Sequence, residues 1–198
     1  MSIGLILECG PEGADKLVCE YFAARLRPGV ALVSRTMDDK PSLLNDAATA
    51  ASALLADGCE RVLIVWDLRP AWPDTTTKAC RAVERLTLLK SLTAAGLHGR
   101  PVYLVCVEQE LESWLLADEA KLSSFLSTPE HAYTVARVRA PDRVQIPKSK
   151  VMNHFREARG WRYEDRVHAI KVLREGEPNW SRLRRSDSFA RFEAKLLC

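Results

Sequence analysis

Residues 3–13 read IGLILECGPEG, an apolar run that ends at Glu8 and leads into a Gly-Pro turn. Two later apolar runs follow the same pattern and lead into Asp67 and Glu108. Short apolar runs bounded by turn residues are typical of buried strands. Because the carboxyl ends of parallel strands lie side by side at one edge of an α/β sheet, where ligands bind, we expect these three acidic residues to share that edge.

Strand and helix patterns alternate through residues 1–126. The expected strands are residues 3–7, 30–33, 62–66 and 101–107, and the expected helices are residues 12–26, 41–55, 75–95, 111–117 and 119–126. This alternation predicts an α/β, Rossmann-like fold with a central, mostly parallel four-stranded sheet. Helices flank the sheet and connect its strands by right-handed crossovers.

Residues 127–198 follow a different pattern, which is mainly helical. Helical periodicity marks residues 148–158, 163–173 and 186–197, and residues 133–138 suit an edge strand. No internal repeat or flexible linker separates this part from residues 1–126. We therefore expect one domain over residues 1–198, made of an α/β core and a helical C-terminal part.

The composition is that of a soluble globular protein. The chain has 198 residues, of which 47% are hydrophobic and 28% charged. No run of 18 apolar residues occurs, so we expect no membrane span, and the N-terminus lacks the features of a signal peptide. The six cysteines form no CxxC pair and match no zinc site. Free thiols and a cytoplasmic location are expected.

Charge is distributed unevenly along the chain. Residues 137–198 hold 16 Lys and Arg against 8 Asp and Glu, a net charge of +8. Residues 1–136 hold 13 basic and 18 acidic residues, a net charge of −5. An acidic half joined to a basic half suits a metal-dependent enzyme that acts on a polyanion. The alternative is that the basic residues are solvated helix faces.

Glu8 and Glu12 flank the Gly-Pro turn, with Glu8 at the end of a strand and Glu12 at the expected start of a helix. An acidic residue at a helix start also suits the helix dipole, so Glu12 alone has a structural explanation. Glu8 ends a buried strand and needs a partner. Clustered carboxylates raise one another's pKa unless a cation lies between them, and Mg²⁺ or Mn²⁺ is the cation that oxygen ligands suit.

A strand that ends in Glu, a Gly-Pro turn and a second acidic residue resemble the opening motif of Toprim domains, as in OLD-type nucleases. In Toprim proteins a later strand ends in Asp-x-Asp, and the two motifs hold divalent metal. Residues 65–69 read VWDLR, so Asp67 matches the first Asp while Arg69 stands where the second belongs. Asp74, in the following loop, is a candidate to replace the missing ligand.

Three downstream stretches resemble a small Toprim-like family of unknown function. They are residues 107–118 (VEQELESWLLAD), residues 147–150 (PKSK) and residues 188–192 (SFARF). The resemblance covers almost the whole chain in the family's order. It implies a place in prokaryotic defence against phage, beside an OLD-like or other AAA-type ATPase partner.

The resemblance implies a Toprim-type, Mg²⁺- or Mn²⁺-dependent nuclease acting on DNA or RNA. Glu8, Asp67 and Glu110 are the expected catalytic carboxylates, with Lys148 as the cation that neutralises charge on the scissile phosphate. The expected metal ligands are Glu8, Glu12, Asp67, Glu110 and Glu112. The expected nucleic-acid contacts are Lys150, Arg182, Arg184 and Arg185.

Most of these residues also suit plainer structural roles. Lys148 suits a surface position at a helix start, and the Arg182–Arg185 cluster suits a solvated face. The competing hypothesis for the whole chain is a non-catalytic Toprim-like partner or effector module of an ATPase, which Arg69 favours. A homodimer is a further expectation that the sequence leaves open.

Overall fold

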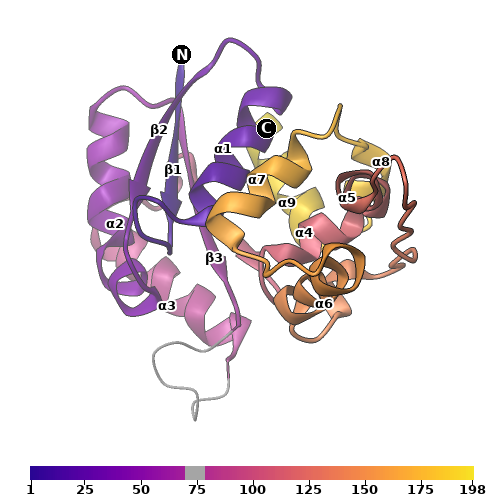
Figure 1. Ribbon diagram of the computed structural model, residues 1–198. Coiled ribbons are helices and arrows are strands. Elements are labelled where there is room, and N and C mark those ends of the chain that lie inside the picture. Colours follow the sequence, from indigo (N-terminus) through magenta and orange to yellow (C-terminus); the bar gives the residue numbers. More distant parts are fainter. Residues whose placement is uncertain (70–78) are drawn as a thin grey trace.

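A computed structural model of the chain describes residues 1–69 and 79–198. Four strands form one sheet in the order β2-β1-β3-β4, and every neighbouring pair is parallel (Figure 1). The strands are β1 (Ser2–Leu7), β2 (Ala31–Thr36), β3 (Arg61–Asp67) and β4 (Val102–Val107). The α/β fold and the four-stranded parallel sheet expected from the sequence are thereby confirmed.

The register brings the carboxyl ends of the three acidic strands level with one another. Leu7 pairs with Val65, and Asp67 pairs with Val107. Glu8 follows Leu7 directly, so it lies beside the last residues of β3. The carboxyl edge of the sheet therefore carries Glu8 and Asp67 on adjacent strands.

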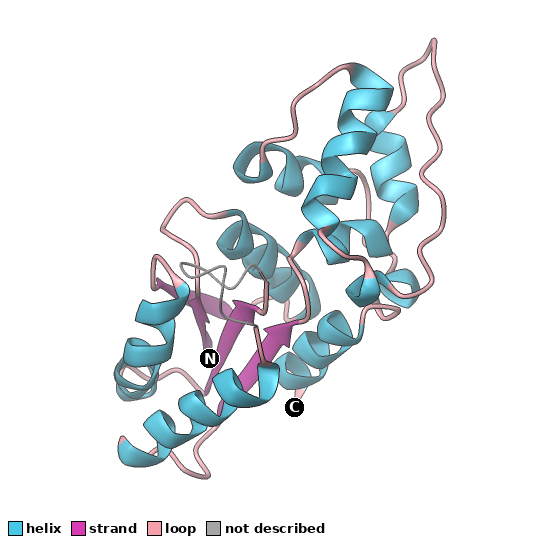
Figure 2. Ribbon diagram, turned by 90° about the horizontal axis from the view of Figure 1, so that it is seen from below, coloured by secondary structure: helices cyan, strands magenta, loops and turns pink. Residues whose placement is uncertain are grey.

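Helices cover both faces of the sheet. On one face α2 (Lys40–Ala56) and α3 (Arg81–Ala94) pack over a buried cluster that includes Ile6, Ile64 and Trp66. On the other face α1 (Ala14–Leu26) and α9 (Asp187–Leu197) pack over Leu5, Leu7 and Val65. Figure 2 shows the sheet between its two helical layers. The alternation of apolar side chains to opposite faces follows from the period of two in a strand.

Gly4 allows α2 to approach β1 closely. A Cβ atom at position 4 would lie 2.9 Å from Cδ1 of Leu54 and 3.1 Å from Cγ2 of Val62. A glycine inside a strand commonly marks such a close approach. The tight contact of α2 with β1 therefore depends on the missing side chain.

The C-terminal helices share a core with the sheet. They are α4 (Glu112–Ala117), α5 (Glu119–Leu126), α6 (Pro147–Arg159), α7 (Asp165–Leu173), α8 (Trp180–Leu183) and α9, with a 3-10 turn at Pro141–Arg143. An aromatic cluster joins them to α1, because Phe22 and Trp114 both make edge-to-face contacts with Phe189. Trp114 also donates a hydrogen bond from Nε1 to Oγ of Ser188 at 2.9 Å.

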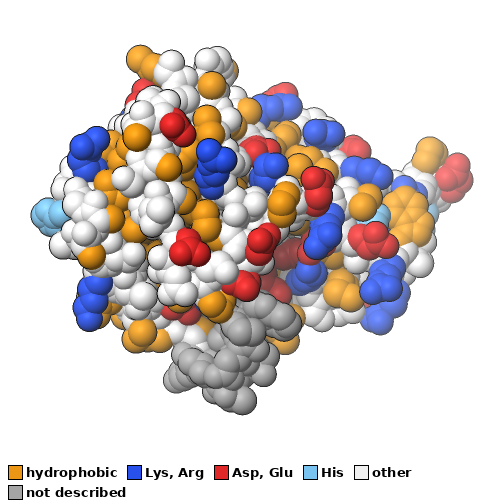
Figure 3. Space-filling view, turned by 90° about the vertical axis from the view of Figure 1, so that its left-hand side faces the viewer, with side chains coloured by type: hydrophobic (Ala, Val, Ile, Leu, Met, Phe, Trp, Pro, Cys, Tyr) orange, Lys and Arg blue, Asp and Glu red, His pale blue; other side chains and the backbone are white. Residues whose placement is uncertain are grey.

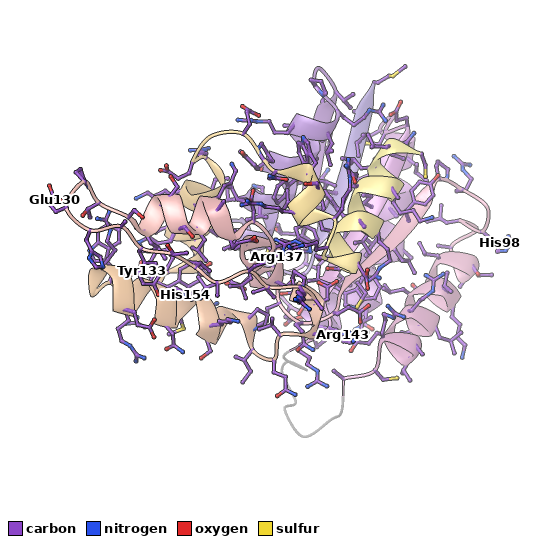
Figure 4. All side chains as sticks on the ribbon, turned by 90° about the vertical axis from the view of Figure 1, so that its right-hand side faces the viewer. His98, Glu130, Tyr133, Arg137, Arg143 and His154 are labelled. Atoms are coloured by element: carbon purple, nitrogen blue, oxygen red, sulfur yellow. The ribbon has the colours of Figure 1, made fainter. Side chains whose placement is uncertain are left out.

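The prediction of an edge strand at residues 133–138 is wrong, because these residues form no strand. The backbone N–H groups of Tyr133 and Val135 donate to the hydroxyl oxygens of Ser127 and Ser123, each at 2.9 Å, instead of to a strand. Tyr133 Oη also lies 2.9 Å from Nδ1 of His154 on α6, and Figure 4 shows the two side chains together. Side-chain partners from the neighbouring helices thus replace the partners a sheet would supply.

Most other element boundaries agree with expectation to within a few residues. α1 begins at Ala14, two residues later than expected, and α3 begins at Arg81. Residues 75–78, where the sequence predicts the start of the helix that precedes β4, lie outside the described residues. Within residues 1–69 and 79–198, none of the helices has the length and apolar character needed to cross a bilayer.

Candidate functional site

The connections of the sheet diverge between β1 and β3. From β1 the chain crosses to β2 on one side, and then returns to β3 on the other side. In open α/β sheets, ligands bind beyond the carboxyl ends of the strands at such a switch point. Glu8 and Asp67 lie at this point, as the sequence predicts.

Glu8 carries an unsatisfied buried oxygen. Its Oε2 atom is buried, and no group in the described residues forms a hydrogen bond with it. Burial raises the pKa of Glu8 to about 7, while nearby Lys40 lowers it and Asp15 raises it further. A buried acceptor without a partner is costly, so this oxygen is suited to a bound cation or a proton.

Asp67 is held by one backbone hydrogen bond and surrounded by other acids. The N–H of Leu111 donates to its Oδ2 at 3.2 Å. Burial raises the pKa of the Asp67 carboxyl well above its usual range. Three other carboxylates add to this increase: Asp15, Glu8 and Glu112. Their negative charges therefore act on one another across the carboxyl edge.

Glu112 lies in the first turn of α4 and is 6% exposed. The hydroxyl of Tyr163 donates to its Oε1 at 3.2 Å. Burial raises the pKa of Glu112 to about 7, although Lys148 lowers it. The two glutamates that the sequence places two residues apart therefore have different surroundings, because Glu110 points to the start of α6 instead.

Glu110 receives a hydrogen bond from the backbone N–H of Lys148 at 2.9 Å. The Lys148 ammonium in turn pairs with Asp165 at the start of α7. Burial lowers the pKa of Lys148, but the Asp165 hydrogen bond and the nearby Glu112 outweigh it, and the net change is upward. Lys148 is therefore a charged group at the border of the acidic cluster, with 41% of its side chain exposed.

Ile146 precedes this turn in an unusual backbone conformation. Its φ of 50° and ψ of 62° are left-handed, and it occupies the N-cap position of α6. A β-branched residue in this region is an outlier that costs about 1–3 kcal/mol. The conformation delivers Pro147 and Lys148 to the acidic edge.

Two residues of the site, Asp15 and Lys40, are not predicted by the sequence. Asp15 lies in the first turn of α1, and burial raises its pKa to about 6, with Asp165 contributing and Lys148 opposing. The signal for Asp15 is an acidic residue two positions after Gly13. The sequence prediction misses it because it starts the helix at Glu12. Lys40 is 4% exposed, and its Nζ donates to the carbonyl of Leu68 at 2.9 Å.

Lys40 also lies 3.7 Å from Glu84 Oε1, whose other oxygen accepts a hydrogen bond from Trp66 Nε1 at 2.8 Å. It follows β2 in the chain and starts α2, so it too is placed at the carboxyl edge. Lysine at a helix start has no distinctive sequence signal, because the same pattern is common on protein surfaces.

Several expected residues lie away from the cluster. Glu12 is exposed in the turn before α1, and Glu108 pairs with Arg81 and Arg191. Arg69 is exposed after β3, and its backbone N–H donates to the carbonyl of Gln109 at 3.1 Å. Asp74, the proposed replacement ligand, lies outside the described residues.

The three C-terminal arginines make contacts within the fold. Arg184 pairs with Glu193 through two hydrogen bonds of 2.6 and 2.8 Å. Arg185 donates to the carbonyl of Val138 at 2.9 Å and also pairs with Glu119, while Arg182 lies 3.9 Å from the same glutamate. Lys150 is exposed on α6. Nucleic-acid binding by these residues stays a prediction.

The arrangement concentrates negative charge at one edge of the molecule. Figure 3 shows acidic side chains near the middle of the face in view, with Lys and Arg side chains among them and to their right. Among residues 1–69 and 79–198, no three Asp, Glu, His or Cys side chains converge as a ready-made metal site. The oxygen donors and the unpartnered Glu8 Oε2 nevertheless fit a hard divalent cation in chemical type.

Comparison with known proteins gives no relative: neither the protein-family models, nor the curated proteins, nor the solved structures contain a match to this chain. The structure itself shows the four-stranded parallel α/β sheet and the acidic residues at its carboxyl edge.

Proposed function

We propose that this protein is a Toprim-type nuclease that hydrolyses phosphodiester bonds in DNA or RNA with Mg²⁺ or Mn²⁺. The main support for the proposal is the unpartnered, buried carboxylate oxygen of Glu8. Its buried Oε2 has no hydrogen-bond partner in the described residues, and it lies at the switch point beside Asp67. Burial and neighbouring carboxylates raise the pKa of both residues, although Lys40 partly lowers that of Glu8.

The cation would be held by Glu8 and Asp67, with Glu112 or Asp15 completing the set after a modest movement of side chains. Bound there, the metal would supply a Lewis acid and lower the pKa of a coordinated water. The carboxylates must lose their protons to bind it, so metal affinity should rise as the pH increases through about 7. Glu12, which is exposed in the turn before α1, is not needed in this set.

Lys148 has the place and charge to stabilise the phosphate. Its ammonium is held by Asp165 and remains partly exposed at the border of the cluster. A cation fixed next to the reacting phosphate stabilises the charge that develops in the transition state. Glu110 accepts a hydrogen bond from the backbone N–H of Lys148, so its proposed role is to position Lys148.

The test compares Glu8→Gln and Asp67→Asn with Glu12→Gln, which changes an exposed carboxylate of the same loop. Cleavage of labelled single- and double-stranded DNA and RNA is followed with Mg²⁺, with Mn²⁺ and with chelator. We expect the first two variants to lose cleavage at least 100-fold and Glu12→Gln to retain it. Thermal unfolding of each variant shows whether it is folded. Equal cleavage by wild type and both site variants would refute the proposal.

A second candidate is a non-catalytic partner module of an AAA-type ATPase, for instance in a prokaryotic defence system. The absence of a ready-made ligand triad among the described residues favours it, as does Arg69 in place of a second aspartate. Calorimetric titration distinguishes the two candidates. Mn²⁺ binding that is lost in Glu8→Gln supports the nuclease, whereas no binding at millimolar metal supports the module. Sedimentation of the free protein tests the expected homodimer.

A further inference from the structure

A groove lies on the surface along α6 and the segment that connects it to α7. Its volume is about 420 Å³, within the range of small-ligand sites. Six of the residues that line it are Ser149, Met152, Arg156, Trp161, Arg162 and Tyr163. The full lining, which belongs to the described part of the chain, contains two arginines and no acidic side chain.

The groove combines an exposed aromatic ring with positive charge. Trp161 is 43% exposed and Met152 42%, although large apolar side chains are costly to leave in water. The guanidinium of Arg159 lies 4.4 Å from the centre of the Trp161 ring, and the ring of His168 is stacked at 6.4 Å. These contacts fix the indole, and they present an aromatic and guanidinium surface of the type on which nucleobases stack.

The groove lies close to the acidic edge. Tyr163 lines the groove and donates its hydroxyl hydrogen bond to Glu112 of the acidic cluster. Along α6, Ser149 of the lining directly follows Lys148. Arg156 is eight residues beyond Lys148, which places it about 12 Å further along the helix axis. The groove and the acidic edge are therefore neighbours in the fold.

We infer that this groove binds an unpaired nucleotide of a single-stranded nucleic acid. The base lies against Trp161, and Arg156 and Arg162 neutralise the adjacent phosphates. A base inside a duplex has both faces covered by its neighbours, so the groove selects single strands or unpaired ends. The inference rests on the proposed function only for the direction of the strand, which runs toward the acidic edge.

The test measures binding without cleavage. Fluorescence anisotropy with labelled dT20 and U20 oligonucleotides, and with a 20-base-pair duplex, is recorded in chelator. We expect Trp161→Ala to weaken single-strand binding about tenfold, because the stacking of a base on the aromatic side chain is lost. Trp161→Phe should bind better than Trp161→Ala, since it keeps an aromatic face. Arg156→Ala/Arg162→Ala should weaken binding and reduce its salt dependence.

Arg100→Ala is the control for losing a positive charge outside the groove, because Arg100 is exposed and precedes β4 at the opposite edge of the sheet. It should bind as wild type does. Single-strand binding that is unchanged in both Trp161→Ala and the double-arginine variant would overturn the inference, as would equal binding of the duplex. If the wild-type protein binds single strands through Trp161 but cleaves no nucleic acid, the proposed nuclease activity is refuted. The inferred binding in the groove is then still supported.

Discussion

The backbone N–H of Lys148 lies 2.9 Å from Oε2 of Glu110, and this bond fastens the start of α6 to the chain that leaves β4. It brings a residue from the basic C-terminal part to the acidic edge of the sheet. The two charge-biased parts of the sequence therefore meet at one place. Their meeting point is flanked by Asp165 on α7 and by Glu112 on α4.

Gly13→Ala should disturb the turn that separates Glu8 from α1. A Cβ atom at position 13 would lie 2.5 Å from Sγ of Cys9 and 3.0 Å from the carbonyl oxygen of Gly10. We expect a loss of about 1–3 kcal/mol in the free energy of unfolding, measured by urea denaturation. Gly10→Ala is the control in the same turn, because its Cβ would meet only Asp38 Oδ1 at 3.4 Å. Equal stability of Gly13→Ala and wild type would contradict the packing described.

The stability of the metal-free protein should fall between pH 5 and pH 8. The pKa values of Glu8 and Glu112 are raised from 4.5 to about 7, so the folded state binds more protons than the unfolded state in this window. Each buried group then contributes a loss of about 1–3 kcal/mol as the pH rises. Urea denaturation in chelator at several pH values measures this slope.

Glu8→Gln and Glu112→Gln should each make that pH dependence shallower, because neither side chain can ionise. Glu12→Gln, which changes an exposed carboxylate, should leave it unchanged. A slope that is the same in all four proteins would show that the buried carboxylates do not control it.

Lys40→Met should raise the pKa of Glu8 above its value of about 7, because Lys40 lowers that pKa in the wild type. It should also cost about 3 kcal/mol in unfolding free energy, since Glu84 would lose a buried positive neighbour at 3.7 Å. The double variant Lys40→Met/Glu84→Gln should recover part of the loss. Carbon-13 NMR titration of the Glu8 carboxyl measures the first effect. A lower Glu8 pKa in Lys40→Met would contradict the role given to Lys40.

Asp142→Ala should destabilise the junction between α4 and α9. Asp142 is 9% exposed and accepts hydrogen bonds from the Ser186 hydroxyl and from both the backbone N–H and the hydroxyl of Ser188, at 2.7–2.8 Å. Leaving these buried donors without an acceptor should cost at least about 2 kcal/mol, measured by thermal or urea unfolding. Asp46→Ala, an exposed position on α2, should have little effect. Wild-type stability in Asp142→Ala would disprove this role.

The sequence predicts the sheet well, because each buried strand combines an apolar run with a turn signal, and strict alternation with helices leaves few topologies. It also places Glu8 and Asp67 at one edge, since parallel strands align their carboxyl ends. It fails where side chains replace a regular pattern. Residues 133–138 have the sequence pattern of a strand. In the structure, however, the hydroxyl oxygens of Ser127 and Ser123 accept hydrogen bonds from the backbone N–H groups of Tyr133 and Val135. Asp15 and Lys40 enter the site through tertiary packing, which no local pattern records.

Three stretches of the sequence, residues 107–118, 147–150 and 188–192, are joined by hydrogen bonds. Trp114 from the first stretch donates to Ser188 from the last, so the two are joined in the core. Lys148 from the middle stretch is bonded to Glu110 from the first. Each of these two hydrogen bonds joins residues that are far apart in the sequence. A substitution at one residue of either bonded pair should therefore affect the position of its partner.

The left-handed Ile146 has a meaning for protein engineering. Glycine adopts that conformation without steric penalty, and Ile146 is 64% exposed, so little buried surface would be lost on replacement. Ile146→Gly relieves the backbone strain, but it also makes the unfolded chain more flexible, which opposes folding. The free energy of unfolding should therefore stay the same or increase by about 1 kcal/mol. A thermostable variant can therefore be sought at the entrance to α6, where the natural residue leaves stability unused beside the candidate site.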